Sequence, residues 1–516
     1  MKRINSINFV AALLLVLTTS CSDFEAINKN PNSPETVPTQ SLIAYVEKSI
    51  VDEIRSTNLS IGRSDLYVQW LANNTYTDAD RYYWISSSGN DSWKNLYLAQ
   101  SNLDEIIRLN SDETTRAQAA QNGDNNNQIA VARILKVFTY QVMTDIWGDI
   151  PYSSYAGSNS TFDAGKADQG IIYAQYATQQ DIYKDLLKEL KEASDQINTS
   201  SAAFASGDAI YKGNALKWKK FANSLSIRIA NRVRHKLSEA DARMQEIISN
   251  PGQYPVFESN DDNALLAFET NAPNQAPFYK ATTLANRNDY AVSNVFVDFL
   301  KGKKSLFPVQ DPRLTVYAQP NAKGSYVGQF YGIDMYTASL VSPDSVSKPG
   351  VAFYKSDFKE VLMEYAELQF IFSEYKNWNQ EHYLNGIRAS MQKWGVGASD
   401  IENFIQQVPV ASAATVLTQK WAALFMQGNE GWAEYRRTGY PDFLVKAGDE
   451  VWKGVVNGQV VTKVFEPIGV TSVPSRLLYP NSEVQLNPVQ YQKAVAQQGA
   501  DLLNTQVWWD KQEDPF

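Results

Sequence analysis

Apolar side chains recur every three or four positions along much of the chain, which is the pattern of amphipathic helices. Leu42, Val46, Ile50 and Ile54 form one such stripe. The pattern predicts helices over residues 42–54, 93–107, 134–142, 172–197, 216–234, 240–248, 358–372, 381–394, 401–407, 411–427 and 431–437. Modest loops separate these segments, so we expect a mainly α fold in which antiparallel helix pairs stack side by side.

Two long segments depart from the helical pattern. Residues 253–356 are rich in Pro, Gly, Asn, Ser and Tyr, and only residues 292–300 look helical; residues 438–516 are again irregular. Long irregular segments in a helical protein usually carry function or form a mobile cover. We therefore predict one domain over residues 39–516, with a helical scaffold at about 39–250 and 357–437.

The N-terminus has the pattern of a secretory signal. Lys2 and Arg3 precede an apolar stretch at residues 9–17, which is too short to span a bilayer, and small residues then lead to Cys21. Residues 1–20 are therefore predicted to be a lipoprotein signal peptide, with Cys21 acylated and residues 21–38 as a tether. Thr18 stands where leucine is usual, so an ordinary secreted protein with a cysteine at this place is the alternative.

Composition narrows the possible functions. Loss of Lys2 and Arg3 with the signal would change the formal net charge from −9 to −11, which argues against nucleic acid as a partner. Cys21 is the only cysteine and the chain has two histidines, so disulfides, cysteine catalysis and histidine-rich metal sites are not expected. The sequence also lacks the common nucleotide, zinc-protease and serine-hydrolase motifs, so we predict no cofactor, no metal and no catalytic residue.

An aromatic loop is the strongest candidate for a binding site. Residues 73–93 place several rings among Asn, Asp, Ser and Arg without helical spacing. Exposed rings of this kind can stack on the C–H faces of sugars while polar neighbours bind the hydroxyls; peptides fit nearly as well, and packing of the loop onto the body is the structural alternative. The candidate ligand-binding residues in this loop are Asn73, Tyr76, Tyr82, Tyr83 and Trp84.

The irregular insert offers two further clusters with the same chemistry. One contains Asn286, Arg287, Asn288 and Tyr290, and the other centres on Tyr331. Loop packing explains these clusters equally well.

Three glutamates raise the possibility of catalysis. Glu364, Glu367 and Glu374 lie near one face of a predicted helix, and two carboxylates about 5 Å apart could hydrolyse a glycosidic bond with retention. The structural alternative is that Arg436 and Arg437, from a later helix, pair with these carboxylates.

Several segments together resemble the SusD/RagB family of Bacteroidetes outer-membrane nutrient-binding lipoproteins, most closely its SusD-like subgroup 2. The resemblance rests on residues 21–24, 28–32, 146–152, 364–368, 373–374, 427–441, 473–480, 483, 487 and 507–510. It implies a tetratricopeptide-like helical-hairpin scaffold with a large irregular ligand-binding region. It also implies lipid anchoring in the outer membrane, facing the cell exterior, and a SusC-like TonB-dependent transporter as partner.

These observations favour a binding protein over an enzyme. The expected function is capture of an oligosaccharide at the cell surface and its delivery to the transporter. An oligopeptide ligand is the alternative within the same class, and a surface glycoside hydrolase that uses paired carboxylates is the alternative from another class.

Overall fold

The computed structural model describes residues 37–157 and 159–511. The predicted signal peptide, Cys21 and nearly all of the predicted tether therefore lie outside the described residues. Within the described residues, no helix is both long enough and apolar enough to cross a membrane.

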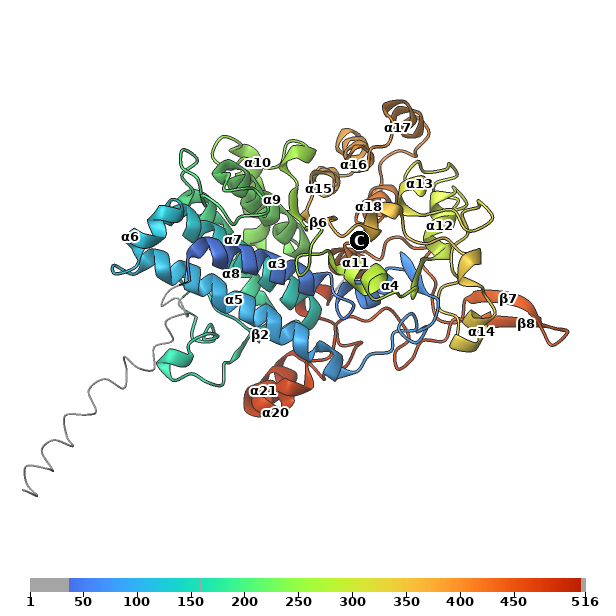
Figure 1. Ribbon diagram of the computed structural model, residues 1–516, viewed down its shortest axis with the longest axis horizontal. Helices are drawn as coiled ribbons and strands as arrows, with labels where there is room; N and C mark the ends of the chain where they lie inside the picture. The colour runs from blue at the N-terminus through green and yellow to red at the C-terminus, as the bar shows by residue number, and fades with distance from the viewer. Residues whose placement is uncertain (1–36, 158, 512–516) are drawn as a thin grey trace, which may run out of the picture.

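Six long helices account for most of the described residues up to 249, and each packs against the next of them in chain order. Figure 1 shows them from blue to green on one side of the molecule. They are α3 (Thr39–Ile54), α5 (Asn90–Ser111), α7 (Asn125–Trp147), α8 (Gln179–Gln196), α9 (Ala215–Val233) and α10 (Ser238–Ser249). The stacked pairs confirm the predicted mainly α scaffold.

Helix α8 illustrates why these segments fold as they do. The side chain of Thr178 accepts a hydrogen bond from the backbone N–H of Asp181 and so caps the first turn. Leu186 and Leu190 lie on the inward stripe and are fully buried. The helix begins later than the apolar pattern predicted, because residues 171–175 form an irregular segment in which Ile172 is exposed.

A second group of helices follows the irregular insert. It contains α15 (Tyr365–Tyr375), α16 (Gln380–Lys393), α17 (Ala398–Ile405), α18 (Ala413–Ala423) and α19 (Gly428–Thr438). Helix α15 packs against α16, α18 and α9, so it joins the two helical groups. Residues 358–364 were predicted as part of this helix; instead β6 (Lys359–Met363) pairs with β4 (Ala264–Ala267), and helix begins only at Tyr365.

The irregular regions hold short elements around the helical body. The remaining helices are α4 (Asp65–Tyr67), α6 (Arg116–Ala119), α11 (Pro277–Tyr279), α12 (Asn294–Leu300), α13 (Leu314–Tyr317), α14 (Met335–Ser339), α20 (Asn481–Leu486) and α21 (Pro488–Gln498), with π-helical turns η1 (Ser60–Ser64) and η6 (Lys280–Leu284). The other strand pairs are β1 (Leu71–Asn73) with β5 (Tyr290–Val292), β2 (Ile150–Pro151) with β3 (Tyr176–Ala177), and β7 (Glu450–Val456) with β8 (Gln459–Val464).

The region after residue 438 contains more regular structure than its composition indicated. Strands β7 and β8 form a hairpin that projects from the side of the molecule opposite α6, and α20 and α21 lie along another edge (Figure 1). The two-residue turn between the strands is Asn457–Gly458, both with positive φ, which is the backbone that a tight hairpin requires.

Candidate functional site

A two-stranded sheet brings together two loops that are distant in the sequence. Strands β1 and β5 are antiparallel, and Asn73 lies opposite Tyr290 in their register. The next residue, Asn74, strengthens the junction: its backbone N–H donates to the carbonyl of Asp289 at 2.7 Å, and its Nδ2 donates to the carbonyl of Asn288 at 2.9 Å. The aromatic loop and the Asn286–Tyr290 cluster, predicted as separate candidates, are therefore neighbours.

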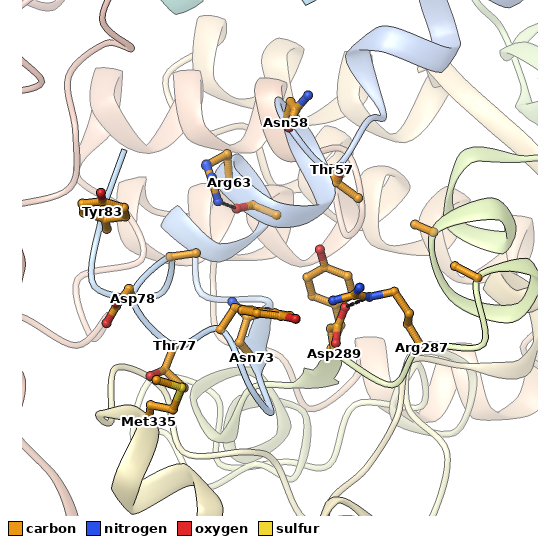
Figure 2. Close-up of a pocket in the computed structure, with 16 residues that line it drawn as sticks. Thr57, Asn58, Arg63, Asn73, Thr77, Asp78, Tyr83, Arg287, Asp289 and Met335 are labelled. Carbon is orange, nitrogen blue, oxygen red and sulfur yellow. Dashed lines mark hydrogen bonds and ion pairs between the residues drawn. The ribbon is translucent and has the colours of Figure 1, made fainter. Parts of the chain in front are cut away.

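A cavity of about 620 Å³ opens between these two loops. In Figure 2, Tyr83 and Arg287 lie on opposite sides of this space, with Asn73 between them and Met335 of α14 below. The cavity is lined by Thr57, Asn58, Gly62, Arg63, Asn73, Tyr76, Thr77, Asp78, Ala79, Tyr83, Ala281, Ala285, Arg287, Asp289, Tyr290 and Met335. Five of the ten predicted ligand-binding residues are in this set: Asn73, Tyr76, Tyr83, Arg287 and Tyr290.

Two lining tyrosines expose their rings. Tyr76 is 57% exposed and Tyr83 is 46% exposed, and Met335 adds a third exposed apolar side chain. Apolar area of this kind beside polar groups is typical of a site that meets a ligand rather than of a packed surface.

Charged side chains of both signs surround the same space. Arg287 Nε donates to Asp289 Oδ2 at 2.5 Å, and its guanidinium lies 5.2 Å from the centre of the Tyr76 ring. Asp78 pairs with Arg81 at 2.6 Å. The cavity therefore offers donors and acceptors without a single dominant charge.

Behind the cavity wall lies a buried carboxylate, Asp80. It accepts two hydrogen bonds from Asn73, one from the backbone N–H at 2.9 Å and one from Nδ2 at 2.5 Å. Burial raises the pKa of Asp80 to about 7, although both hydrogen bonds and the charge of Arg81 act in the opposite direction.

Three of the predicted aromatic residues are core residues instead. Tyr82 is 1% exposed because the turn of residues 78–83 gives it a positive φ and directs its ring inward, edge-to-face with Tyr67 and Phe465. Trp84 is 6% exposed and is covered by the guanidinium of Arg63 at 5.0 Å. Tyr331 is fully buried against Phe465. The expectation that these three rings meet a ligand is therefore corrected.

Asn286 and Asn288 do not line the cavity either. Both are exposed, and Asn288 contributes its backbone carbonyl to the junction with Asn74. Asn286 has a positive φ, a conformation that asparagine tolerates well. The backbone of the turn therefore explains why an asparagine stands at this position.

The three glutamates considered for catalysis lie in the interior of the scaffold. Glu374 forms two hydrogen bonds of 2.7 Å with Arg437, Glu367 pairs with Arg228, and Glu364 pairs with Lys393. All three carboxylates are buried and none lines the cavity. The ion pairs agree with the structural alternative for Glu374, whereas Glu364 and Glu367 have partners that the sequence did not indicate.

Several lining residues were not predicted from the sequence. Thr57 and Asn58 lie in the turn between α3 and η1, and Arg63 lies in η1; the polar side chains of this segment gave no distinctive pattern. Asp78 stood in the aromatic loop and could have been included with its neighbours. Among the described residues, no group of three or more His, Cys, Asp or Glu is arranged to hold a metal ion.

The fold and the cavity define a helical-hairpin protein with a loop-built surface pocket. The chain belongs to the SusD-like family, subgroup 2, which is described as "Starch-binding associating with outer membrane" and whose model matches residues 31–463. The resemblance inferred from the sequence is thereby confirmed.

Solved structures with the same fold cover nearly the whole chain. A chitin-binding protein is 24% identical, covers 92% of this chain and 100% of its own, and has a TM-score of 0.73. A chitin-binding SusD homolog from Flavobacterium johnsoniae is 23% identical over 92% and 99% of the two chains, with a TM-score of 0.70. A SusD homolog from Parabacteroides distasonis is 19% identical over 92% and 98%, with a TM-score of 0.73. No curated protein matches this chain.

Proposed function

We propose that this protein captures an oligosaccharide in the cavity between Tyr76, Tyr83 and Arg287 and delivers it to a SusC-like TonB-dependent transporter. In this proposal it is lipid-anchored through Cys21 in the outer membrane and faces the cell exterior. Binding involves no covalent step, because ring stacking and a few hydrogen bonds provide the affinity.

The observation that carries the proposal is the pairing of exposed tyrosine rings with polar groups around one cavity. Its volume of about 620 Å³ is within the usual range of small-ligand sites, roughly 300–1,000 Å³. Tyr76 and Tyr83 offer flat apolar faces, while Asn73, Arg287 and Asp289 offer hydrogen-bonding groups. Sugars present both kinds of surface at once. The family description and the two chitin-binding structural relatives support the same ligand class.

Isothermal titration calorimetry tests the proposal directly. Hexamers of N-acetylglucosamine and of α-linked glucose are the first ligands, and an unrelated hexapeptide library tests the peptide alternative. Tyr83→Ala should weaken the bound hexamer by about tenfold, since stacking and lost apolar contact both contribute. Tyr173→Ala is the matched control, because Tyr173 is also exposed but lies outside the cavity. Equal affinities for both variants would contradict the proposed site.

The hydrolase alternative has a separate test. The carboxylates that line the cavity, Asp78 and Asp289, each pair with an arginine. Glu364, Glu367 and Glu374 are buried elsewhere. We therefore expect no new reducing ends when the protein is incubated with the hexamer that it binds. Steady release of reducing ends that Asp289→Asn abolishes would favour the enzyme.

The anchor and the transporter require experiments in the cell. Cys21→Ser should leave the protein without fatty acid and release it from the membrane, since only a thiol accepts the diacylglycerol. Tagged wild-type protein should co-purify with a TonB-dependent transporter from detergent-solubilised outer membranes. An unlabelled wild-type protein, or one that purifies alone, would contradict the respective part of the proposal.

A further inference from the structure

Asn73 is held from behind by Asp80. The carboxylate of Asp80 is fully buried, and its two oxygens accept from the backbone N–H and from Nδ2 of the same residue. Asn73 ends strand β1 and lines the cavity, so Asp80 lies one layer behind the wall that a ligand would meet. Residues 74–79 of the aromatic loop connect Asn73 to Asp80 along the chain.

The two hydrogen bonds fix the orientation of the Asn73 amide. An ionised carboxylate can only accept hydrogen bonds, so the NH₂ group of Asn73 must turn toward Asp80 and its Oδ1 must turn away. Within residues 37–157 and 159–511, no side chain or backbone group donates a hydrogen bond to this Oδ1. The amide therefore keeps one free acceptor at a wall of the cavity.

We propose that Asp80 is a positioning residue that makes Asn73 present its carbonyl oxygen to the ligand. This inference rests on the proposed binding function and narrows the ligand class. The preferred ligand must offer an O–H or N–H donor at this position, as a sugar hydroxyl or an acetamido N–H does. A ligand that offers only an acceptor there leaves both oxygens unpaired.

The arrangement also makes binding sensitive to pH. Desolvation places the pKa of Asp80 at about 7, and the groups that face it are Arg81 on the same loop, Tyr290 of β5 and Tyr331 beyond it. Below that pH the carboxyl is protonated and carries a donor of its own. One of its oxygens then no longer accepts from Asn73 with full strength, and the amide can rotate.

Calorimetry from pH 5.5 to pH 8.5 tests the proposal, with the N-acetylglucosamine hexamer as probe, or the α-glucan hexamer if that one binds. Wild-type affinity should fall by about five- to tenfold as pH falls through 7, the effect of one weakened hydrogen bond. Asp80→Asn should bind weakly at every pH, with a flat profile. Asp149→Asn is the matched control: Asp149 is also buried, with its pKa raised to about 6 by desolvation, but it lies outside the cavity. This control should keep the wild-type profile.

A measurement on the protein without ligand tests the role of Asp80 independently of the binding proposal. Hydrogen exchange of the Asn73 backbone N–H, measured by mass spectrometry on a peptide covering residues 71–77, reports the hydrogen bond from this group to Asp80. Protection relative to the intrinsic rate should fall below pH 7 in the wild type and be low at all pH values in Asp80→Asn. Parallel pH profiles for wild type and Asp80→Asn, in affinity or in exchange, would overturn the positioning role. If neither hexamer binds, the proposed function fails, while the exchange profile still decides whether Asp80 holds Asn73.

Discussion

The helical scaffold and the cavity both contain ion pairs between a carboxylate and an arginine, but the pair in the scaffold is buried and the pair at the cavity is partly exposed. In the scaffold, Glu374 and Arg437 form a bidentate pair whose side chains are 1% and 6% exposed. At the cavity, Asp289 and Arg287 form a pair whose side chains are 16% and 45% exposed. The buried pair is surrounded by further partners, including Glu434 and Asn231, whereas the exposed pair has one side open to the cavity.

The difference indicates which groups are available to a ligand. A buried charge must have all its hydrogen bonds satisfied within the protein, because an unpaired one carries a large desolvation penalty. An exposed pair is already hydrated, so a ligand can replace water at little cost. The helical half should therefore determine stability, and the loops around the cavity should determine affinity.

The largest expected loss of stability follows removal of one partner of the buried Glu374–Arg437 pair. Glu374→Ala leaves Arg437 without its bidentate partner in the interior, so the free energy of unfolding should fall by about 3–5 kcal/mol. Chemical denaturation measures this loss. Glu402→Ala is the control, because Glu402 pairs with Arg388 on the surface, and its denaturation curve should overlay the wild-type curve. Similar losses for both variants would contradict the distinction between buried and exposed pairs.

The apolar core of the scaffold should respond almost as strongly. Leu190 is fully buried on α8, and Leu190→Ala should lower the free energy of unfolding by about 2–5 kcal/mol through lost contacts and the cavity that remains. The affinity of the folded variant for its hexamer should be unchanged, as calorimetry well below the melting temperature can show. A selective loss of affinity would mean that α8 contributes to the site.

Periodicity was sufficient to predict the scaffold but not the loop that forms the cavity. Leu186 and Leu190 lie on the inward face as their spacing predicted, because a helix repeats one geometry at every turn. Tyr82, Tyr83 and Trp84 are equally aromatic neighbours in the sequence, yet only Tyr83 is exposed. The inward direction of the Tyr82 ring depends on its positive φ and on its contact with Phe465, the residue that follows β8. A single sequence contains no signal for such a contact.

Trp84 and Tyr83 are neighbours in the aromatic loop and allow the same comparison of a buried with an exposed side chain. Trp84→Ala removes a ring packed beneath Arg63, so its main effect should be a loss of about 3–5 kcal/mol in the free energy of unfolding. Tyr83→Ala should leave the melting temperature nearly unchanged and act on affinity alone. Thermal melting beside calorimetric titration of both variants distinguishes the two roles. The reverse assignment of effects would place the ligand against Trp84.

The last comparison is between two buried carboxylates whose contributions to stability depend on pH with opposite sign. Burial raises the pKa of Glu434, but the charges of Arg437, Lys420 and Arg232 outweigh burial and leave it well below its ordinary value. This carboxylate stabilises the fold fully above its unfolded pKa of about 4.5, and the contribution is lost as pH falls below that value. Asp80 behaves in the opposite way: its pKa is raised to about 7, so the folded state favours the protonated form. Its favourable contribution is complete below about pH 4 and is lost as pH rises to about 7.

Melting temperatures of Asp80→Asn and Glu434→Gln between pH 4 and pH 8.5 measure how the stability contributed by each carboxylate changes with pH. Relative to wild type, Asp80→Asn should become steadily more stable from about pH 4 to pH 7 and then remain level, because it avoids burying an ionised carboxylate. Glu434→Gln should remain below wild type by a constant amount above about pH 5 and approach wild type only in stronger acid. Parallel curves for the two variants would show that Asp80 is stabilised as an anion, like the carboxylates of the scaffold. The pH dependence of binding would then need a different group at the cavity.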